Sequence, residues 1–240
     1  MDSVRSRLPD PSLGLSVPTA GSNVLKVIEN FLDNPYVPLC GAYIHVSLKR
    51  YPNETDIEEL VSKIRRLHAM VSVVILTNSS GGLYPETMYN LATRTNGLGF
   101  FEADENGAAE HEMNYFYWSP FLVYSVNVNV CQTGYMTLPY FYSSKALLLL
   151  IELTVQDSGV LSTFQSYSLN FTSPTDTQFC SQRFSASKPT RNYMYCNFSP
   201  RAGNHYTVTL DYAYSDSKHQ TLQLRMTSIE PINYWIPYAN

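Results

Sequence analysis

Cysteines are the residues of this chain whose spacing most directly suggests chemistry. Cys180 and Cys196 fall in neighbouring predicted strands, and the stretch between them is long enough for a hairpin. A disulfide across that hairpin would stabilise the fold by roughly 3 kcal/mol, and the alternative is two buried thiols. Cys40 and Cys131 do not show the spacing of a zinc site with any of the five histidines, so we predict no metal and no cofactor.

A catalytic nucleophile would need Cys40 or a serine beside His45 or His68, with an acid to orient the imidazole. His68 follows two arginines at the end of a predicted helix, where a cation near the carbonyl end is usual. His45 alternates with aliphatic residues in a predicted strand, which is typical of a structural residue. We therefore predict no catalytic residue, and the chain is not expected to be an enzyme.

The NSSGG turn at residues 78–82 is the one loop whose composition suggests a ligand site. Two glycines before a helix can hold an anion on their backbone N–H groups. The sequence matches neither the dinucleotide fingerprint nor a Walker loop, so a plain connecting turn is favoured. A small-ligand-binding enzyme that uses this turn is kept as an alternative function.

Around these residues the chain reads as strand, helix, strand, helix, strand, with strands at Ala42–Leu48, Val71–Leu76 and from Gly99. The unbroken apolar run of the second strand is typical of a strand covered on both faces. Two successive crossovers predict a three-stranded parallel βαβαβ sheet. The first fold class is therefore α/β.

Local signals place the ends of the helices in this part of the chain. Thr55 and Glu58 form a predicted capping box at the start of the first crossover helix. Pro85 suits the first turn of the second, and Gly97 is expected to end it in the left-handed conformation. An earlier helix is predicted from an apolar stripe at Val24, Leu25, Ile28, Phe31 and Leu32.

From Tyr115 the apolar pattern changes to a period of two, which predicts an all-β region. Turn-forming residues separate the segments, which favours an antiparallel β-sandwich or jelly roll. Strands are expected at Tyr115–Trp118, Leu122–Val130, Ala146–Val155, Phe164–Phe171, Gln178–Ser185, Tyr193–Phe198, Tyr206–Tyr214 and Gln220–Ser228.

The motifs KRYPNETD, VSVVILT and LATRTNGLGFF resemble the second half of a von Willebrand factor A-type domain, a Rossmann-like fold. The resemblance covers residues 22–104, and the whole chain is similar to secreted multi-domain proteins of nematodes that have no known activity. The expected organisation is a flexible lead-in over 1–21, a partial A-type domain over 22–104, a linker over 105–114 and a β-sandwich over 115–240.

The resemblance also implies what this sequence lacks. A-type domains bind a divalent cation through an Asp-x-Ser-x-Ser loop after their first strand, and no such segment is present. A further acid usually follows the strand that matches Ala42–Leu48, where this chain has Lys49 and Arg50. We therefore predict no metal-dependent adhesion site.

A missing first half would leave one edge of the Ala42–Leu48 strand without a partner. We expect that edge to be covered by the N-terminal segment, by the β domain or by pairing with another chain. The disulfide partner of Cys40 is then either Cys131 or a cysteine in the missing half.

Composition sets the remaining limits: 44% of residues are hydrophobic, 15% are charged, and the net charge is −4. These values favour a packed core and give no basis for nucleic-acid or anionic-membrane binding. No apolar run reaches the ~20 residues that span a bilayer. Residues near Met1 show no secretory signal, which taken alone would place the chain in the cytoplasm.

Other features favour an extracellular glycoprotein whose signal peptide lies outside this sequence. They are the four cysteines and the glycosylation sequons at Asn53, Asn78 and Asn170. A fourth sequon at Asn197 is a poor acceptor because Pro200 follows it.

Aromatic residues close to the C-terminus, Tyr234, Trp235 and Tyr238, suggest a recognition surface for a protein or a carbohydrate. The alternative is that they close the bottom of the sandwich. The sequence thus predicts a non-enzymatic extracellular interaction or adhesion protein of unknown ligand. The alternatives are the enzyme described above and a truncated product without independent function.

Overall fold

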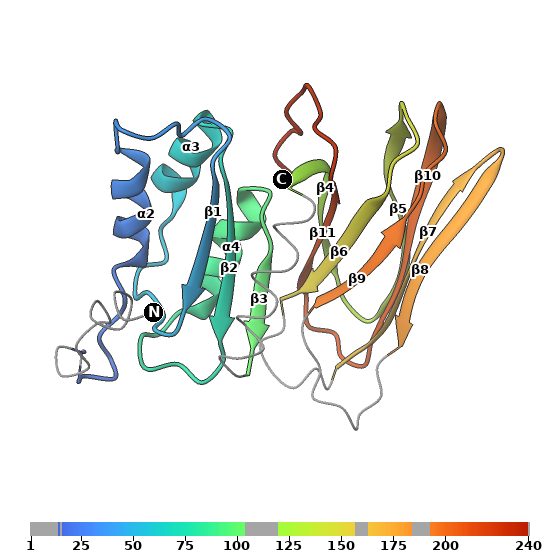
Figure 1. Ribbon diagram of the computed structural model, residues 1–240. Helices are drawn as coiled ribbons and strands as arrows, with labels where there is room; N and C mark the ends of the chain where they lie inside the picture. The colour runs from blue at the N-terminus through green and yellow to red at the C-terminus, as the bar shows by residue number, and fades with distance from the viewer. Residues whose placement is uncertain (1–13, 15, 104–119, 157–162, 184–192, 240) are drawn as a thin grey trace, which may run out of the picture.

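The computed structural model describes residue 14 and residues 16–103, 120–156, 163–183 and 193–239. Its layers follow one another across the molecule: helices α2 and α3, a parallel sheet, and two antiparallel sheets (Figure 1). The predicted combination of an α/β unit with an antiparallel β-sandwich is confirmed. No helix in the described ranges has both the length and the apolar character needed to cross a membrane.

The α/β domain has three parallel strands in the order β1-β2-β3, as the βαβαβ pattern predicts. Within the described residues β1 is an end strand of this sheet and pairs with β2. Pairing of β1 with another chain therefore stays a prediction. The elements are α2 (Val24–Leu32), β1 (Tyr43–Leu48), α3 (Glu58–Arg66), β2 (Met70–Leu76), α4 (Pro85–Arg94) and β3 (Gly99–Glu102).

Both faces of β2 are buried, which explains its unbroken apolar sequence. Val73 and Ile75 belong to the core that the three helices cover. Val74 faces the opposite side and packs in a second cluster with Phe100 of β3 and Tyr193 of β9. The rings of Phe100 and Tyr193 meet edge to face with centroids 5.4 Å apart. The parallel sheet is therefore packed between the helices and the β-sandwich.

The predicted Thr55–Glu58 capping box is wrong. The N–H of Glu58 donates instead to Oδ1 of Asp56, at 3.1 Å. The carboxylate of Glu58 accepts two hydrogen bonds from the guanidinium of Arg94 on α4, both at 2.6 Å. A charged partner on the neighbouring helix thus takes the carboxylate that the capping box would have used.

The left-handed residue after α4 is Asn96, with φ of 60°, and not Gly97 as predicted. Gly97 has a different role, because a Cβ there would lie 1.8 Å from the carbonyl oxygen of Val71. The chain needs glycine at this position for close contact with β2.

The β-sandwich consists of two four-stranded antiparallel sheets (Figure 1). The sheet β4-β11-β6-β9 lies next to the parallel sheet and is here called the inner sheet, and β5-β10-β7-β8 is the outer sheet. Their facing side chains form one apolar core. The strands are β4 (Phe121–Val130), β5 (Thr133–Ser143), β6 (Leu149–Val155), β7 (Phe164–Ser173), β8 (Asp176–Arg183), β9 (Tyr193–Phe198), β10 (Asn204–Tyr214) and β11 (Gln220–Ser228).

Strand β5 was not predicted, because Gly134 and Pro139 interrupt its pattern. Pro139 fits because β5 is an end strand that pairs only with β10 among the described residues, and Gly134 fits because a Cβ there would lie 2.3 Å from the hydroxyl of Tyr212. The register shifts by a bulge next to Pro139, so a missing N–H there costs no regular ladder bond. The predicted strand Tyr115–Trp118 lies outside the described residues.

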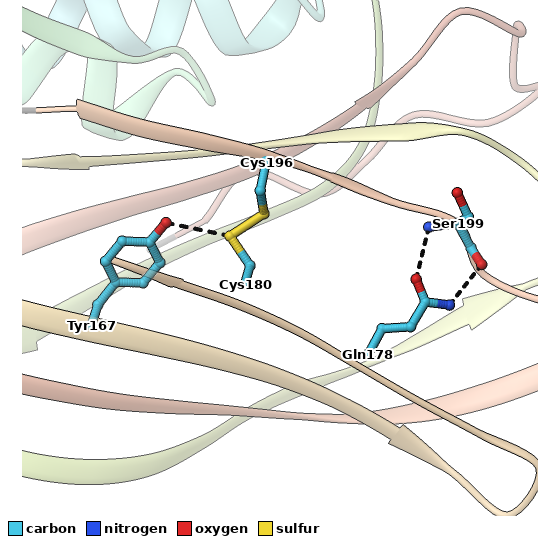
Figure 2. The surroundings of a disulfide bond; sticks show 5 residues. All are labelled: Tyr167, Gln178, Cys180, Cys196 and Ser199. Atoms are coloured by element: carbon cyan, nitrogen blue, oxygen red, sulfur yellow. Dashed lines mark hydrogen bonds between the residues drawn. A yellow bond between two sulfur atoms is a disulfide. The ribbon is translucent and has the colours of Figure 1, made fainter. Parts of the chain in front are cut away.

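A disulfide joins Cys180 of β8 to Cys196 of β9 (Figure 2). The expectation of a hairpin is wrong, because β8 lies in the outer sheet and β9 in the inner sheet. The bond therefore connects the two sheets through their shared core. The hydroxyl of Tyr167 lies 3.3 Å from Sγ of Cys180.

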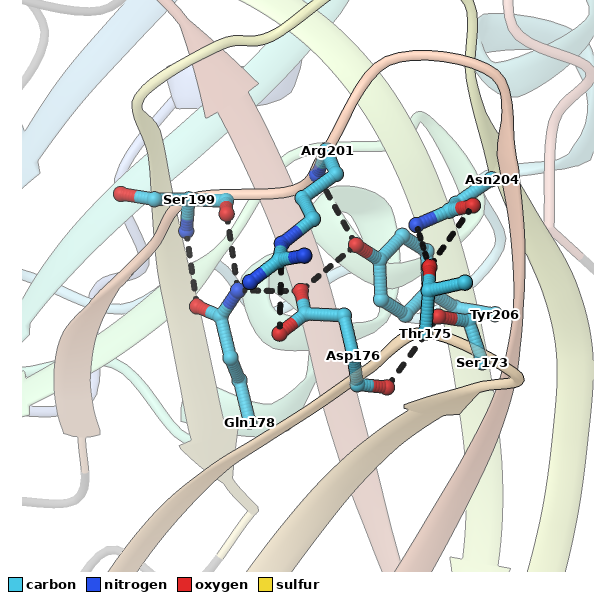
Figure 3. Close-up of polar contacts among 8 residues, drawn as sticks. All are labelled: Ser173, Thr175, Asp176, Gln178, Ser199, Arg201, Asn204 and Tyr206. Atoms are coloured by element: carbon cyan, nitrogen blue, oxygen red, sulfur yellow. Dashed lines mark hydrogen bonds and ion pairs between the residues drawn. The ribbon is translucent and has the colours of Figure 1, made fainter.

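A polar cluster makes a second connection between the sheets (Figure 3). The carboxylate of Asp176 accepts from Nε2 of Gln178 at 2.7 Å and from the hydroxyl of Tyr206 at 2.8 Å. Gln178 also exchanges hydrogen bonds with the backbone of Ser199, just after β9. The hydrogen bonds from Gln178 and Tyr206 lower the pKa of Asp176 below its ordinary value.

Replacing both Cys180 and Cys196 by alanine should lower the free energy of unfolding by about 3 kcal/mol. The bond joins residues 16 apart in the sequence, and closing a loop of that length restricts the unfolded chain by about this much. Urea denaturation monitored by circular dichroism measures the change. The control replaces the free thiols of Cys40 and Cys131 by serine, which should leave stability nearly unchanged. Equal loss in both variants would contradict the role of the bond.

Asp176→Asn should lower the melting temperature by a few degrees near neutral pH. The folded-state pKa of Asp176 lies below its unfolded value, so its stabilisation is present above the unfolded pKa and is lost as pH falls through the folded one. The difference between variant and wild type should shrink below about pH 4. Thermal unfolding across a pH series checks this, and a difference that does not change with pH would exclude an ionised Asp176 as the cause.

Candidate functional site

The segment after β11, residues 229–239, leaves the sandwich and lies on the α/β domain; it is here called the C-terminal segment. The hydroxyl of Tyr238 donates to the carbonyl of Ala69 at 2.8 Å. The guanidinium of Arg65 lies 5.2 Å from the centre of the Tyr238 ring. Asn96 donates to the carbonyl of Pro237 at 3.1 Å. The segment is thus fixed to α3, to the residue before β2 and to the turn after α4.

The predicted aromatic surface divides into one anchoring residue and two half-exposed ones. Tyr238 is the anchor, whereas Tyr234 and Trp235 are 57% and 56% exposed. Trp235 stacks on the ring of His68, with centroids 4.8 Å apart and planes 3° apart. Its edge lies so close to Gly41 that a Cβ there would be 2.6 Å away. The alternative that these aromatics close the bottom of the sandwich is wrong, because they lie on the α/β domain.

These aromatics line a groove of about 510 Å³ between the α/β domain, the start of β4 and the C-terminal segment, here called the interdomain groove. Its volume falls in the range of roughly 300–1,000 Å³ that is usual for ligand pockets. The lining residues are Cys40, Gly41, Tyr43, His68, Met70, Asn96, Pro120, Phe121, Leu122, Ile232, Asn233, Tyr234, Trp235, Ile236 and Tyr238.

A smaller cavity of about 100 Å³ adjoins the interdomain groove and is here called the floor cavity. The two share Tyr43, Met70, Asn96, Pro120 and Leu122. The floor cavity adds polar side chains that the groove does not reach, namely Ser72, Glu152, Arg225 and Thr227.

Glu152 is a buried carboxyl group in the floor cavity, 7% exposed. It lies on β6, on the face of the inner sheet that is directed toward the parallel sheet, since its neighbours Ile151 and Leu153 lie in the sandwich core. Its carboxyl group forms no hydrogen bond or ion pair with any residue in the described part of the chain. Burial raises the pKa of Glu152 to about 7, although the charge of Arg225 opposes the rise.

Arg225 is Glu152's cross-strand neighbour on β11, yet its guanidinium is directed elsewhere. It is 1% exposed, and carbonyl or amide oxygens accept from all its N–H groups. Because one of these oxygens belongs to the last turn of α4 and another follows it, the buried cation caps the carbonyl end of that helix. The acceptors are the backbone oxygens of Thr93, Asn96, Val126 and Leu224 and Oδ1 of Asn127, at 2.9–3.5 Å.

Tyr43 supplies a hydroxyl group to both cavities. Its oxygen lies 2.6 Å from Oγ of Ser72, which also accepts from the N–H of Leu98 at 2.9 Å. Burial raises the pKa of Tyr43 well above its ordinary value, so the hydroxyl stays neutral. The floor therefore combines one carboxyl group with neutral hydroxyl groups.

Three backbone N–H groups of the NSSGG turn, those of Ser80, Gly81 and Gly82, are already used within the chain and are not available to an anion. The N–H of Ser80 donates to Lys49 O at 2.8 Å, that of Gly81 to Oγ of Ser79, and that of Gly82 to Pro18 O at 3.0 Å. A Cβ on Gly82 would lie 2.0 Å from the carbonyl oxygen of Tyr51. The space that a ligand would need is filled by the chain itself.

The other residues that were considered for catalysis or metal binding do not form a site in the described part of the chain. Cys40 is exposed and Cys131 half-buried, and neither forms a disulfide. Cys40 and His68 both line the interdomain groove, but no hydrogen bond joins them and the His68 ring is stacked on Trp235. In the described ranges no three His, Cys, Asp or Glu side chains gather as metal ligands would.

The three sequons differ in their surroundings. Asn78 is exposed, and its amide has no hydrogen-bond partner in the described part of the chain. Asn53 donates to Thr19 O at 2.9 Å, so a glycan there would displace that contact. Asn170 lies within β7 and donates weakly to Asp211 at 3.4 Å. Asn78 is the most accessible acceptor, and its glycosylation stays a prediction.

Sequence reasoning missed Glu152 and Arg225 as site residues. The available signal was one charged residue inside each of two apolar segments, LLIELTV and LQLRMTS. A buried charge in a strand calls for a partner or a function. The sequence pattern does not indicate that Glu152 and Arg225 both lie on the face of the inner sheet that is directed toward the α/β domain.

Comparisons with known proteins give no function. The family model for a domain of unknown function, DUF7154, matches residues 126–229. No curated protein matches the chain. At the TM-scores below, the structural similarities identify neither a ligand nor a family.

The similar solved structures are β-rich. The C-terminal carbohydrate-binding module CBM6 of LamC from Zobellia galactanivorans shares 15% identity with a TM-score of 0.31, covering 46% of this chain and 95% of that one. The capsid of Helicobacter pylori bacteriophage KHP30 shares 14% at 0.33, covering 46% and 93%. The module CBM6cm-2 of Cellvibrio mixtus lichenase 5A, solved with cellotriose, shares 10% at 0.28, covering 48% and 94%.

Glu152→Gln should stabilise the protein increasingly as pH rises. Because the folded-state pKa of Glu152 is raised from 4.5 to about 7, its contribution is fully present below the unfolded value and is lost as pH rises through the folded one. The loss is of the order of 3 kcal/mol above pH 7, and glutamine cannot ionise, so the variant avoids it. Urea denaturation from about pH 4.5 to about pH 8 measures the difference. A constant difference would show that Glu152 is not buried from solvent.

Proposed function

We propose that this chain is a non-enzymatic, extracellular interaction protein that binds its ligand in the interdomain groove. The observation that carries the proposal is a groove of about 510 Å³ with aromatic walls and a buried carboxyl group at its floor. Large apolar surface with a few placed polar groups is typical of binding sites. The ligand is a protein segment or a carbohydrate.

The aromatic wall is fixed before a ligand arrives. Trp235 has one face stacked on His68, and Tyr238, three residues later, is held by Ala69 and Arg65. A side chain that is already immobile loses little conformational entropy on binding. Half-exposed Trp and Tyr residues in such positions are typical anchors of recognition surfaces.

The enzyme alternative has little geometric support at the NSSGG turn, where the N–H groups of Ser80, Gly81 and Gly82 donate within the chain. In the interdomain groove no hydrogen bond joins Cys40 to His68, and among the described residues Glu152 has no hydrogen-bonded partner to orient it. General acid–base or nucleophilic catalysis needs such pairs. Binding without chemistry is therefore the better account.

An extracellular location and relationship to A-type domains form the rest of the proposal. The disulfide is consistent with an oxidising compartment. The sheet order β1-β2-β3 is the order expected for half of an A-type domain. Where that family has an acid, Arg50 donates to the carbonyls of Val17 and Ala20 at 3.0 and 2.8 Å, so a divalent cation would face a guanidinium.

The test compares the wild type with a Tyr234→Ala, Trp235→Ala double variant on glycan and peptide arrays. Loss of both aromatics should abolish binding to at least one array ligand, because it removes one wall of the groove, while the melting temperature changes by only a few degrees. The control is Phe179→Ala, which removes an aromatic on the outer sheet that is 74% exposed and lies outside the groove. Ligands retained equally by all three proteins, or no ligand at all, would overturn the proposal.

A further inference from the structure

We infer that the groove's ligand is a neutral, hydroxyl-rich molecule, a saccharide, and that one of its hydroxyl groups binds the carboxyl group of Glu152. This inference rests on the proposed function and names the chemistry of its ligand. It starts from a carboxyl group without a protein partner: Glu152 is 93% buried, lines the floor cavity and forms no hydrogen bond with the described residues. A buried polar group without a partner is unfavourable, and a ligand donor can satisfy it.

An anionic ligand does not fit this floor. Glu152 itself would repel it once ionised, and Arg225, the one cation among the described residues that line the floor cavity, has all its N–H groups directed at protein oxygens. Anion recognition depends on free N–H donors with the right geometry. None is offered here by Arg225.

A cationic ligand is also disfavoured. Arg225 stays charged, because its pKa falls only to about 10, and it is the direct cross-strand neighbour of Glu152. The other titratable group at the floor, Tyr43, is neutral at physiological pH. An ammonium group would place two positive charges around one carboxyl group in a largely buried site, where repulsion is less screened than in bulk water.

A neutral hydroxyl group meets neither obstacle. A protonated Glu152 can donate to it and an ionised one can accept from it, so binding survives titration of the carboxyl group. The hydroxyl of Tyr43, 2.6 Å from Ser72, borders the same cavity. Higher in the groove, Trp235 has one face on His68, and the residue is 56% exposed. The C–H face of a sugar ring can pack against an aromatic face, because the π-system carries negative charge there.

The experiment uses isothermal titration calorimetry with named probes at about pH 6 and about pH 8. Cellobiose, lactose and chitobiose represent neutral saccharides, tyramine a cation and 4-hydroxyphenylacetate an anion. The proteins are the wild type, Glu152→Gln, Glu152→Leu and Trp235→Ala, with Phe179→Ala as the control outside the groove.

At least one saccharide should bind the wild type with an affinity that changes less than about threefold between the two pH values. Glu152→Gln should retain binding within about threefold, since the amide both donates and accepts. Glu152→Leu should lose about tenfold, and Trp235→Ala should lose at least as much. If Glu152→Leu does not fold, Glu152→Met takes its place, because it also removes the hydrogen-bonding atoms at a similar side-chain size.

The following outcomes would contradict the inference. Tyramine binding that strengthens with pH and is lost in Glu152→Gln would show a cation site. Saccharide binding that needs Trp235 but not Glu152 would leave the proposed function intact and exclude the role of Glu152. If no saccharide binds while a peptide from the arrays does so through Trp235, the ligand class is wrong and the groove's function stands.

Discussion

The position of the α/β domain on the sandwich depends on one buried cation. Arg225 places its guanidinium at the carbonyl end of α4 and at β4, with hydrogen bonds to Asn96 and Asn127 among others. Gln223, two residues earlier on β11, receives the N–H of Gly99 at 2.7 Å and donates to Thr93 at 2.6 Å. A buried polar network of this kind has one satisfied geometry, so it sets the relative placement of the two units.

That placement also creates the groove and leaves Glu152 unsatisfied. Asn96 receives a hydrogen bond from Arg225 on its carbonyl oxygen and holds the C-terminal segment through its side chain and the N–H of Ala239. The same turn therefore supports the floor and the wall of the groove. Because Arg225's donors are taken by α4 and the inner sheet, the carboxyl group beside it is left for a ligand or for a proton.

Local patterns were enough to predict the α/β domain and most strands of the sandwich. The unbroken apolar run VSVVIL indicates a strand that is buried on both faces, and the apolar residues of α3 repeat at helical spacing. Both environments could therefore be predicted from the local sequence. Strand β5 was not predicted because Gly134 and Pro139 interrupt its pattern. Both residues are accommodated by tertiary structure, since β5 is a sheet end and the Tyr212 side chain lies close to Gly134. The cysteine pair could be named from its spacing, whereas its placement across two sheets could not. The groove was only partly predictable, because Trp235 is conspicuous in the sequence but the raised pKa of Glu152 comes from burial by the α/β domain, which lies elsewhere in the sequence.

The order of strands in the inner sheet determines when the sandwich can form during synthesis. Among the described residues β4, which ends at Val130, pairs only with β11, which begins at Gln220, so about 90 residues separate two strands that hydrogen-bond directly. Until β11 leaves the ribosome, β4 has no neighbour and the apolar faces of β4 and β6 are exposed together. Pairing across such a sequence distance is slow, because a long loop has to close before the contact is gained. The nascent chain would thus rely on chaperones for longer than its modest size suggests.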